Sequence, residues 1–342
     1  MKNIFLCCAL LFSFCSSNAL GQTATPPSSG DGSSGEPYQI ANLNNLYWVT
    51  QNSTLWSKDF IQTADIDASS SSTWIGDTGF SPIGNEVTEF SGSYDGQNHT
   101  ISGLYIHSSW YGKGMFGFAQ GGTIKNIGLV DVNITANSYA GGLVGFNQSN
   151  ISNCFSTGSV SGTAAWDGGL VGLNDGDISK SYSAASVSGS AWVGGLAGAS
   201  YTNIDNCYSI GSVQGGGAGG LIGKLLLSLT ITNCYSTGPV SGFELGGLVG
   251  DAGGNSVTIS NSFWDNQTSG QSSSAGGGTG YATAVMKTGS TYTDAGWDFT
   301  TIWTIDAGVN HGYPTLQGVI ALPVELVSFT AASNQMSTEL QW

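Results

Sequence analysis

One five-residue phrase recurs between residues 140 and 250 at a nearly constant spacing. It reads Gly-Gly-Leu-Val-Gly or a close variant, and its copies begin at residues 141, 168, 194, 219 and 246, which are 27, 26, 25 and 27 residues apart. Each copy is followed by a phrase like Ile-x-Asn-Cys-Tyr-Ser and, in most copies, by Ser-Val-Ser-Gly. Units of this length are typical of solenoids, in which one unit cannot bury its apolar face alone and successive units stack.

The apolar pieces of the repeat are three to five residues long, and Gly, Ser, Asn and Asp separate them. This pattern favours short strands joined by tight turns. We therefore expect an all-β chain, a right-handed parallel β-helix with three short strands per rung, a rise of ~4.8 Å per rung and a cap at each end. The expected repeat core consists of Leu143, Leu170, Leu196, Leu221, Leu248, Ile151, Ile178, Ile204, Ile231 and Ile259.

The repeated phrases resemble the GLUG motif of bacterial secreted and surface proteins, and five copies match that motif in register. The resemblance implies a secreted or cell-surface β-helix. The segments that flank the repeats resemble those that commonly precede and follow GLUG repeats, which favours a capping role for both.

Changes in composition divide the chain into six segments. We expect a signal peptide at 1–21, a disordered Ser/Gly/Pro linker at 22–36, an N-terminal cap leading into the solenoid at 37–110, the repeats at 111–265, a C-terminal cap at 266–317 and a further module at 318–342. Helical spacing of Ile40, Leu43, Leu46 and Val49 predicts a short amphipathic helix in the N-terminal cap. Large aromatics after residue 280 suggest a plug over the last rung, with Trp297 and Trp303 as packing groups.

The last segment, 318–342, resembles the opening strands of a fibronectin-like module that commonly precedes the type IX secretion signal of Bacteroidetes proteins. The resemblance implies secretion by that route and a module that is truncated here. We expect the mature chain to be secreted or held on the outer cell surface as a monomer, without insertion into a membrane.

Charge excludes some partners. The chain has 7 lysines, no arginine and 22 acids, which give a net charge of −15. Nucleic acids need a basic surface, so we predict no nucleic-acid partner. We also predict no cofactor and no metal, because the repeated cysteine position alternates with Ser181 and no histidine repeats beside it.

Comparison of the copies assigns side-chain directions after each isoleucine. An asparagine column (Asn126, Asn153, Asn206, Asn233, Asn261, broken by Lys180) suits a corner, because asparagine tolerates the left-handed conformation. If the corner forms, the next column, which contains Cys154, points inward, and the aromatic column after it points outward. If the strand runs straight, the aromatics belong to the core. Ile127 and Leu129 in the earliest copy favour the corner.

The aromatic column is the candidate ligand site of the repeats. Its members are Phe155, Tyr182, Tyr208, Tyr235 and Phe263. Stacked exposed tyrosines could bind the apolar faces and hydroxyl groups of sugar rings. A purely structural aromatic stack is the alternative, and solenoids commonly use one.

The cysteines of the repeat leave two possibilities open. Cys207 and Cys234 occupy the same position in neighbouring copies, so they could form a strained disulfide. A column of stacked free thiols is the simpler interpretation.

We predict a non-catalytic protein that adheres to extracellular glycans, matrix or a surface protein. A polysaccharide-active enzyme is the first alternative, but it needs a cluster of carboxylates, and the acids of the repeats are isolated. His99 is the most promising histidine, and a surface role suits it better. The second alternative is ice or crystal binding through Ser159, Ser161, Ser186 and Ser188.

Overall fold

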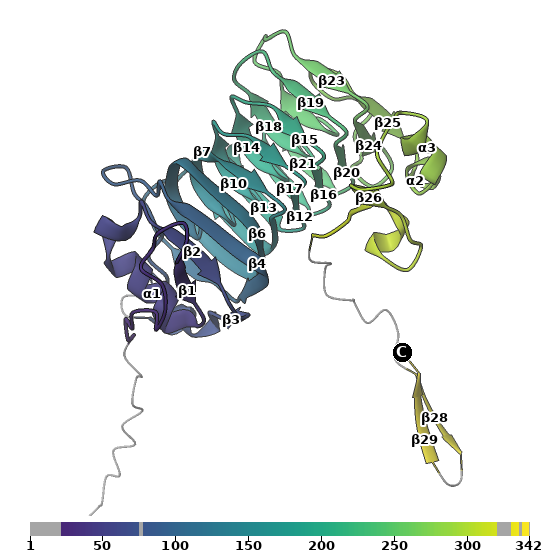
Figure 1. Cartoon of the computed structure of the whole chain (residues 1–342). Helices are drawn as coiled ribbons and strands as arrows, with labels where there is room; N and C mark the ends of the chain where they lie inside the picture. Colours follow the sequence, from purple (N-terminus) through teal and green to yellow (C-terminus); the bar gives the residue numbers. More distant parts are fainter. Residues whose placement is uncertain (1–21, 75–77, 320–329, 335–336, 342) are drawn as a thin grey trace, which may run out of the picture.

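The chain forms a parallel β-solenoid of about 6 turns (Figure 1). The computed structural model describes residues 22–74, 78–319, 330–334 and 337–341. The predicted signal peptide, 1–21, lies outside the described residues. The all-β parallel solenoid expected from the repeat is confirmed.

An N-terminal cap covers the first turn. It comprises β1 (Tyr38–Ile40), α1 (Leu43–Gln51), a 3-10 turn (Ser53–Leu55), β2 (Asp59–Gln62), β3 (Ile66–Asp67) and a second 3-10 turn (Ser69–Thr73). The helix expected in this cap is α1, and the Asn42 side chain caps it by accepting a hydrogen bond from the Asn45 N–H at 3.0 Å.

The turns of the coil follow in order along the chain. The first turns use β4 (Ser93–Ser102), β5 (Tyr105–His107), β6 (Phe116–Ala136), β7 (Val144–Ser152), β8 (Phe155–Gly162) and β9 (Ala165–Gly168). The next use β10 (Val171–Asn174), β11 (Ile178–Ser179), β12 (Tyr182–Ser183), β13 (Ser186–Gly194), β14 (Ala197–Ser200), β15 (Ile204–Asp205), β16 (Tyr208–Ser209) and β17 (Val213–Gly216). The last use β18 (Ile222–Leu225), β19 (Thr230–Thr232), β20 (Tyr235–Ser236), β21 (Val240–Phe243), β22 (Val249–Asp251), β23 (Thr258–Ser260) and β24 (Phe263–Asp265).

After β24, β25 (Thr279–Tyr281) still pairs in parallel with the coil, and the chain then leaves it. The part outside the coil comprises α2 (Thr283–Met286), α3 (Gly289–Thr293), β26 (Trp303–Thr304), a 3-10 turn (Asn310–Gly312) and β27 (Thr315–Leu316). Within the predicted module at 318–342, the structure describes residues 318–319 and an antiparallel hairpin of β28 (Thr330–Asn334) and β29 (Ser337–Gln341). The other residues of that module lie outside the described part.

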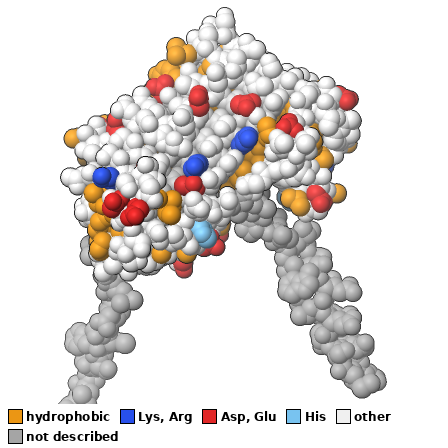
Figure 2. Space-filling model, viewed as in Figure 1, with side chains coloured by type: hydrophobic (Ala, Val, Ile, Leu, Met, Phe, Trp, Pro, Cys, Tyr) orange, Lys and Arg blue, Asp and Glu red, His pale blue; other side chains and the backbone are white. Residues whose placement is uncertain are grey.

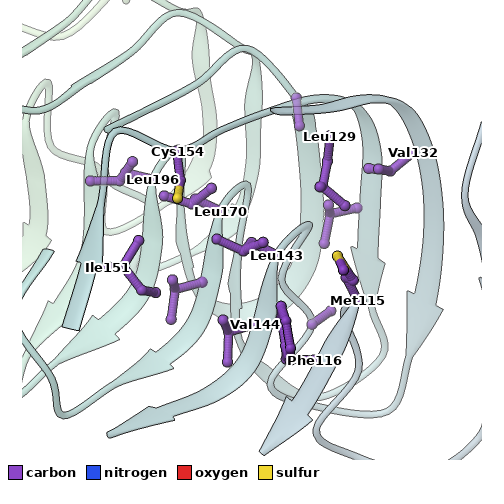
Figure 3. Packing of buried hydrophobic residues seen from close by; sticks show 14 of the residues in the cluster. Met115, Phe116, Leu129, Val132, Leu143, Val144, Ile151, Cys154, Leu170 and Leu196 are labelled. Carbon is purple, nitrogen blue, oxygen red and sulfur yellow. The ribbon is translucent and has the colours of Figure 1, made fainter. Parts of the chain in front are cut away.

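The leucines of the repeated phrase stack in one column inside the coil. The Leu143 N–H donates to the Leu170 carbonyl at 2.9 Å, and the same bond recurs from Leu170 to Leu196, from Leu196 to Leu221 and from Leu221 to Leu248. All five leucines are fully buried. Figure 3 shows Leu143, Leu170 and Leu196 in a row. The isoleucines pair in register in the same way, and only Ile259, in the last rung, is partly exposed.

The asparagine column forms a left-handed corner in every rung. Its φ angles lie between 49° and 54°, and Lys180, which interrupts it, has φ 45°. Between the first two copies, the amide of Asn153 also donates to Asn126 Oδ1 at 3.0 Å. The corner divides the second predicted strand in two. A regular rung therefore has four short strands, for example β14, β15, β16 and β17.

The cysteine side chains lie on the inner side of this corner, next to the asparagine column. The thiols of Cys154, Cys207 and Cys234 are buried and free, and each donates at 3.2 Å to the carbonyl two residues earlier. Ser181 makes the equivalent bond at 2.8 Å. Since either side chain supplies a small donor, cysteine and serine can alternate in the column. The disulfide considered for Cys207 and Cys234 does not form, and burial raises the pKa of Cys154 to about 12.

Close backbone approach explains the glycine pair of the phrase. A Cβ on Gly169 would lie 2.0 Å from Ser183 Oγ and 2.3 Å from the Gly195 carbonyl oxygen. The equivalent serine of the previous rung, Ser156, donates to the Gly169 carbonyl at 2.6 Å across the coil. A side chain at this position would therefore break a buried hydrogen bond and push neighbouring rungs apart.

The segment predicted as a disordered linker, 22–36, is instead held against the N-terminal cap. The Gln39 N–H donates to the Ser29 carbonyl, and the Asp59 N–H donates to the Gly32 carbonyl, both at 3.1 Å. Gly30 and Gly32 have φ of 92° and 77°, which permit the sharp turns needed here. Composition alone predicted disorder because it does not reveal these bonds to strands β1 and β2.

The corner generates a test of stability. Lys180→Asn should raise the free energy of unfolding by about 0.5–1 kcal/mol, because asparagine tolerates the left-handed conformation better than lysine. Thermal unfolding followed by circular dichroism measures the change. The reciprocal Asn153→Lys should lower the midpoint. A Lys180→Asn variant less stable than the parent would contradict this explanation.

Candidate functional site

The predicted aromatic column points away from the inner core, but it is not exposed. Its rings stack almost in parallel, with centroids 4.9 Å apart between Phe155 and Tyr182, 4.6 Å between Tyr182 and Tyr208, and 4.9 Å between Tyr208 and Tyr235. The five side chains, including Phe263, are at most 5% exposed. They form a second hydrophobic cluster, separate from the leucine core.

Residues 283–319, which we call the C-terminal strap, pack against this column at Tyr208, Tyr235 and Phe263. The Trp303 indole donates to Asn206 Oδ1 at 3.0 Å, and the Tyr235 hydroxyl donates to the Pro314 carbonyl at 2.5 Å. The strap lies beside the coil near β16, β20 and β24 (Figure 1). It runs along the coil instead of closing only its end, so the predicted exposure of the column is wrong. Burial raises the pKa values of Tyr208 and Tyr235 well above their ordinary range.

A different set of aromatic side chains remains open to solvent. One row, Tyr139, Trp166 and Trp192, occupies a second left-handed corner with φ of 53°, 64° and 52°. The ring centroids of Tyr139 and Trp166 are 5.0 Å apart, and those of Trp166 and Trp192 are 5.6 Å apart. All three side chains are half-buried. They therefore form a ladder with one edge in water.

Three further rings extend this ladder toward the N-terminal end. Phe118 and Phe146 are neighbours on β6 and β7, 5.7 Å apart, and Phe146 lies 6.3 Å from Tyr139. Tyr111 stands at 87° to Tyr139 and is 37% exposed. We call these six residues the aromatic shelf: Tyr111, Phe118, Tyr139, Phe146, Trp166 and Trp192. Because Tyr111 is turned across the ladder, the shelf presents both ring edges and a ring face.

Charged groups mark both ends of the shelf. Lys224 Nζ lies 4.3 Å from the Trp192 ring centroid and 2.9 Å from Asp251 Oδ2. The ion pair and the Gly253 N–H lower the pKa of Asp251 in spite of its partial burial. At the other end, the Tyr111 hydroxyl donates to the Glu86 carboxylate. The shelf is therefore an apolar ledge with an ion pair at one end and the acid Glu86 at the other.

The sequence analysis missed the shelf, although the sequence carries a signal for it. Tyr139, Trp166 and Trp192 each stand two residues before a glycine pair, and Gly217 and Glu244 take that position in the last two rungs. The signal lies before the glycine phrase, outside the columns that follow each isoleucine, and it is aromatic in three of the five copies.

Asp167 is an acid inside the core. Its neighbours in the column are Ala140 and Val193, and its side chain is fully buried. Oδ1 accepts a hydrogen bond from the Ala140 N–H at 3.2 Å, whereas Oδ2 has no hydrogen-bond partner among the described residues. Burial raises the pKa of Asp167 from 3.8 to about 7. The carboxyl group is therefore neutral below neutral pH.

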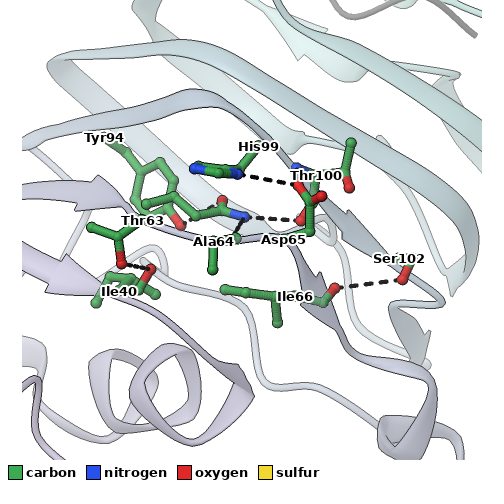
Figure 4. Close-up of polar contacts among 10 residues, drawn as sticks. Ile40, Thr63, Ala64, Asp65, Ile66, Tyr94, His99, Thr100 and Ser102 are labelled. Atoms are coloured by element: carbon green, nitrogen blue, oxygen red, sulfur yellow. Dashed lines mark hydrogen bonds and ion pairs between the residues drawn. The ribbon is translucent and has the colours of Figure 1, made fainter.

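The polar groups near His99 lie on the surface at the N-terminal end. His99 Nδ1 is 3.3 Å from Asp65 Oδ1, which also accepts a hydrogen bond from the Thr100 N–H at 2.8 Å (Figure 4).

Figure 2 shows that charged side chains on this face are scattered over an uncharged surface. No group of three or more His, Cys, Asp or Glu residues in the described ranges is arranged to hold a metal ion. No helix among the same residues is long and apolar enough to cross a membrane.

The buried acid makes stability depend on pH. The folded chain holds the Asp167 proton more tightly than the unfolded chain. The protonated side chain therefore makes its full contribution to the free energy of unfolding below about pH 4, and this contribution is lost as the pH rises to about 7. This loss should be up to about 4 kcal/mol. Denaturant unfolding at several pH values should show that Asp167→Asn removes this decline, whereas Asp177→Asn, at an exposed acid, leaves it. An unchanged decline in Asp167→Asn would refute the assignment.

The strap can be tested separately from the coil. Trp303→Ala removes a fully buried indole and its bond to Asn206, a loss of about 3–5 kcal/mol. We expect the strap to become sensitive to chymotrypsin while the far-ultraviolet β signal of the coil persists. Val285→Ala, at a side chain of the same strap that is 40% exposed, is the control. Loss of the whole β signal would show that the strap is part of the coil's core.

Comparisons with known proteins agree with this architecture. The family model "The GLUG motif" matches residues 136–161. Halomucin of Haloquadratum walsbyi is 34% identical over 138 residues, which are 39% of this chain and 2% of halomucin. A protein of Evansella cellulosilytica provisionally described as a Gly-rich membrane protein is 54% identical over 57 residues, which are 16% of this chain and 6% of that protein. The chain thus spans only a small fraction of these relatives.

A solved structure shows the same fold over most of the chain. It is a protein of Bacteroides ovatus provisionally described as an immunoglobulin A1 protease, with a TM-score of 0.64, 23% identity, and coverage of 85% of this chain and 95% of the other. At this identity the likeness shows the fold alone. The family model matches one repeat, and the same phrases recur in register on successive rungs, so this chain contains GLUG-motif repeats.

Proposed function

We propose that this chain is a secreted or surface-displayed, non-catalytic solenoid that binds extracellular glycans along its aromatic shelf. The observation that carries the proposal is the shelf itself, in which six rings share one half-exposed ledge on successive rungs. Sugar rings present apolar C–H faces with hydroxyl groups around them, and aromatic side chains with polar tips suit such ligands.

The shelf is rigid, which favours binding. Tyr139, Trp166 and Trp192 lie on corners fixed by backbone pairing between rungs, and their rings already touch. Tyrosine and tryptophan have few rotatable bonds, so ordering them on binding costs little entropy. A ladder that follows the coil axis would suit an extended chain better than a compact ligand.

Charge limits the glycans that the shelf would take. The chain carries −15, Glu86 stands at one end of the ledge, and Lys224 at the other end is paired with Asp251. Anionic polysaccharides would be repelled at low salt, so neutral glycans are the expected ligands. The extracellular location is supported by the similarity to halomucin and to a protein described as a membrane protein. We propose that the chain acts there as a monomer.

Substitutions that keep the backbone intact test the proposal. Trp166→Asn together with Trp192→Asn retains a residue that tolerates the left-handed corners while it removes both indoles. Binding of the folded chain to a glycan array should weaken by about tenfold or more. Leu227→Ala, at an exposed loop side chain outside the shelf, is the matched control.

Circular dichroism of the double variant should match the parent. Binding that persists unchanged in the folded double variant would remove the shelf as the site. A parent chain that binds no neutral glycan would refute the proposed function.

A further inference from the structure

We infer that a shallow groove across β13, β17 and β21 is a second site, one that binds an uncharged sugar residue. The groove has a volume of about 410 Å³, within the range of ligand pockets, and spans neighbouring rungs. Its lining consists of Gly162, Ser188, Gly189, Ser190, Gln214, Gly215, Gly216, Gly242 and Phe243. It shares with the proposed function only the carbohydrate class of the ligand.

The floor of the groove is backbone, because the core beneath leaves no room for side chains. A Cβ on Gly162 would lie 2.0 Å from Asp167 Oδ2, and one on Gly189 would lie 2.5 Å from the same atom. A Cβ on Gly215 would lie 2.5 Å from Val193 Cγ2. Because Asp167 and Val193 occupy this space, only glycine fits at positions 162, 189 and 215. The hollow is a consequence of the packed core and is present without a ligand.

Phe243 supplies the apolar contact of the site. Its side chain is 64% exposed, one of the most exposed large hydrophobic side chains among the described residues. The ring lies against Gly216, where an added Cβ would be 2.3 Å from it. An exposed phenyl ring beside a glycine floor can stack on the C–H face of a sugar ring.

Three polar side chains supply the hydrogen bonds. Ser188, Ser190 and Gln214 line the groove, and their side chains make no hydrogen bond to other described residues. They offer free hydroxyl and amide donors and acceptors to a ligand. This set suits sugar hydroxyl groups, which also donate and accept.

The absence of charge in the lining selects the ligand class. None of the nine lining residues is ionisable, and the exposed Glu244 follows Phe243 directly. A carboxylate or sulfate on the sugar would find no cation among the lining residues. A neutral hexose or N-acetylhexosamine unit fits this chemistry, and an acidic sugar does not.

The test compares two sets of variants with defined probes. Calorimetric titrations would use cellohexaose, maltohexaose, mannohexaose and chitohexaose, with hexagalacturonate as the acidic counterpart. In the chain that carries Trp166→Asn and Trp192→Asn, and so lacks the shelf indoles, we expect at least one neutral probe to bind. Phe243→Ala and Gln214→Ala in that chain should each weaken this binding by about tenfold, and hexagalacturonate should not compete. Phe243 and Gln214 are exposed, so both variants should fold, which circular dichroism verifies.

The shelf variant separates this site from the proposed function. Trp166→Asn with Trp192→Asn should leave groove binding intact, while Phe243→Ala should leave shelf binding intact. Three outcomes with the shelf variant would overturn the inference: neutral binding that Phe243→Ala does not change, preferential binding of hexagalacturonate, or no binding of any neutral probe at about 5 mM. If the shelf variant binds the neutral probes as tightly as the parent chain does, only the proposed function is refuted.

Discussion

Parallel backbone pairing between successive units is the interaction on which the rest of this structure depends. Each unit of about 26 residues places its leucine directly beside the leucine of the next, with hydrogen bonds from N–H to carbonyl of 2.8–2.9 Å. One unit alone would expose this apolar face to water. Because each rung buries the apolar face of the next, side chains at one repeat position share one environment. Equivalent positions therefore stack in columns along the coil.

Left-handed corners decide which columns face the core and which face water. At the first corner, asparagine resets the alternation of the strand, so Cys154 points inward and Phe155 points outward. At the second corner, Trp166 and Trp192 are placed outside the coil. The same local conformation thus generates two aromatic ladders on the outer surface, one on each of two corners.

The two ladders differ because of what lies over them. The C-terminal strap covers the tyrosine ladder and bonds to it through Trp303 and the Pro314 carbonyl, so that ladder stabilises the end of the coil. The described part of the chain leaves the ladder of Tyr139, Trp166 and Trp192 half-exposed. An aromatic stack is therefore structural or available for binding according to the segment that crosses it, and the composition of the stack does not decide this.

The sequence by itself determined the solenoid, its period and the leucine core, because each is a property of the repeat and recurs from copy to copy. It favoured the asparagine corner over a straight strand, and the structure decided for the corner. It also contained the shelf, as a column two residues before each glycine pair. Only the tertiary structure decided that the strap covers Tyr208 and Tyr235, that residues 22–36 lie on the cap, and that the space above Asp167 is a glycine-floored groove. These features join segments far apart in the chain or on different rungs, and the pattern within one repeat does not encode such contacts.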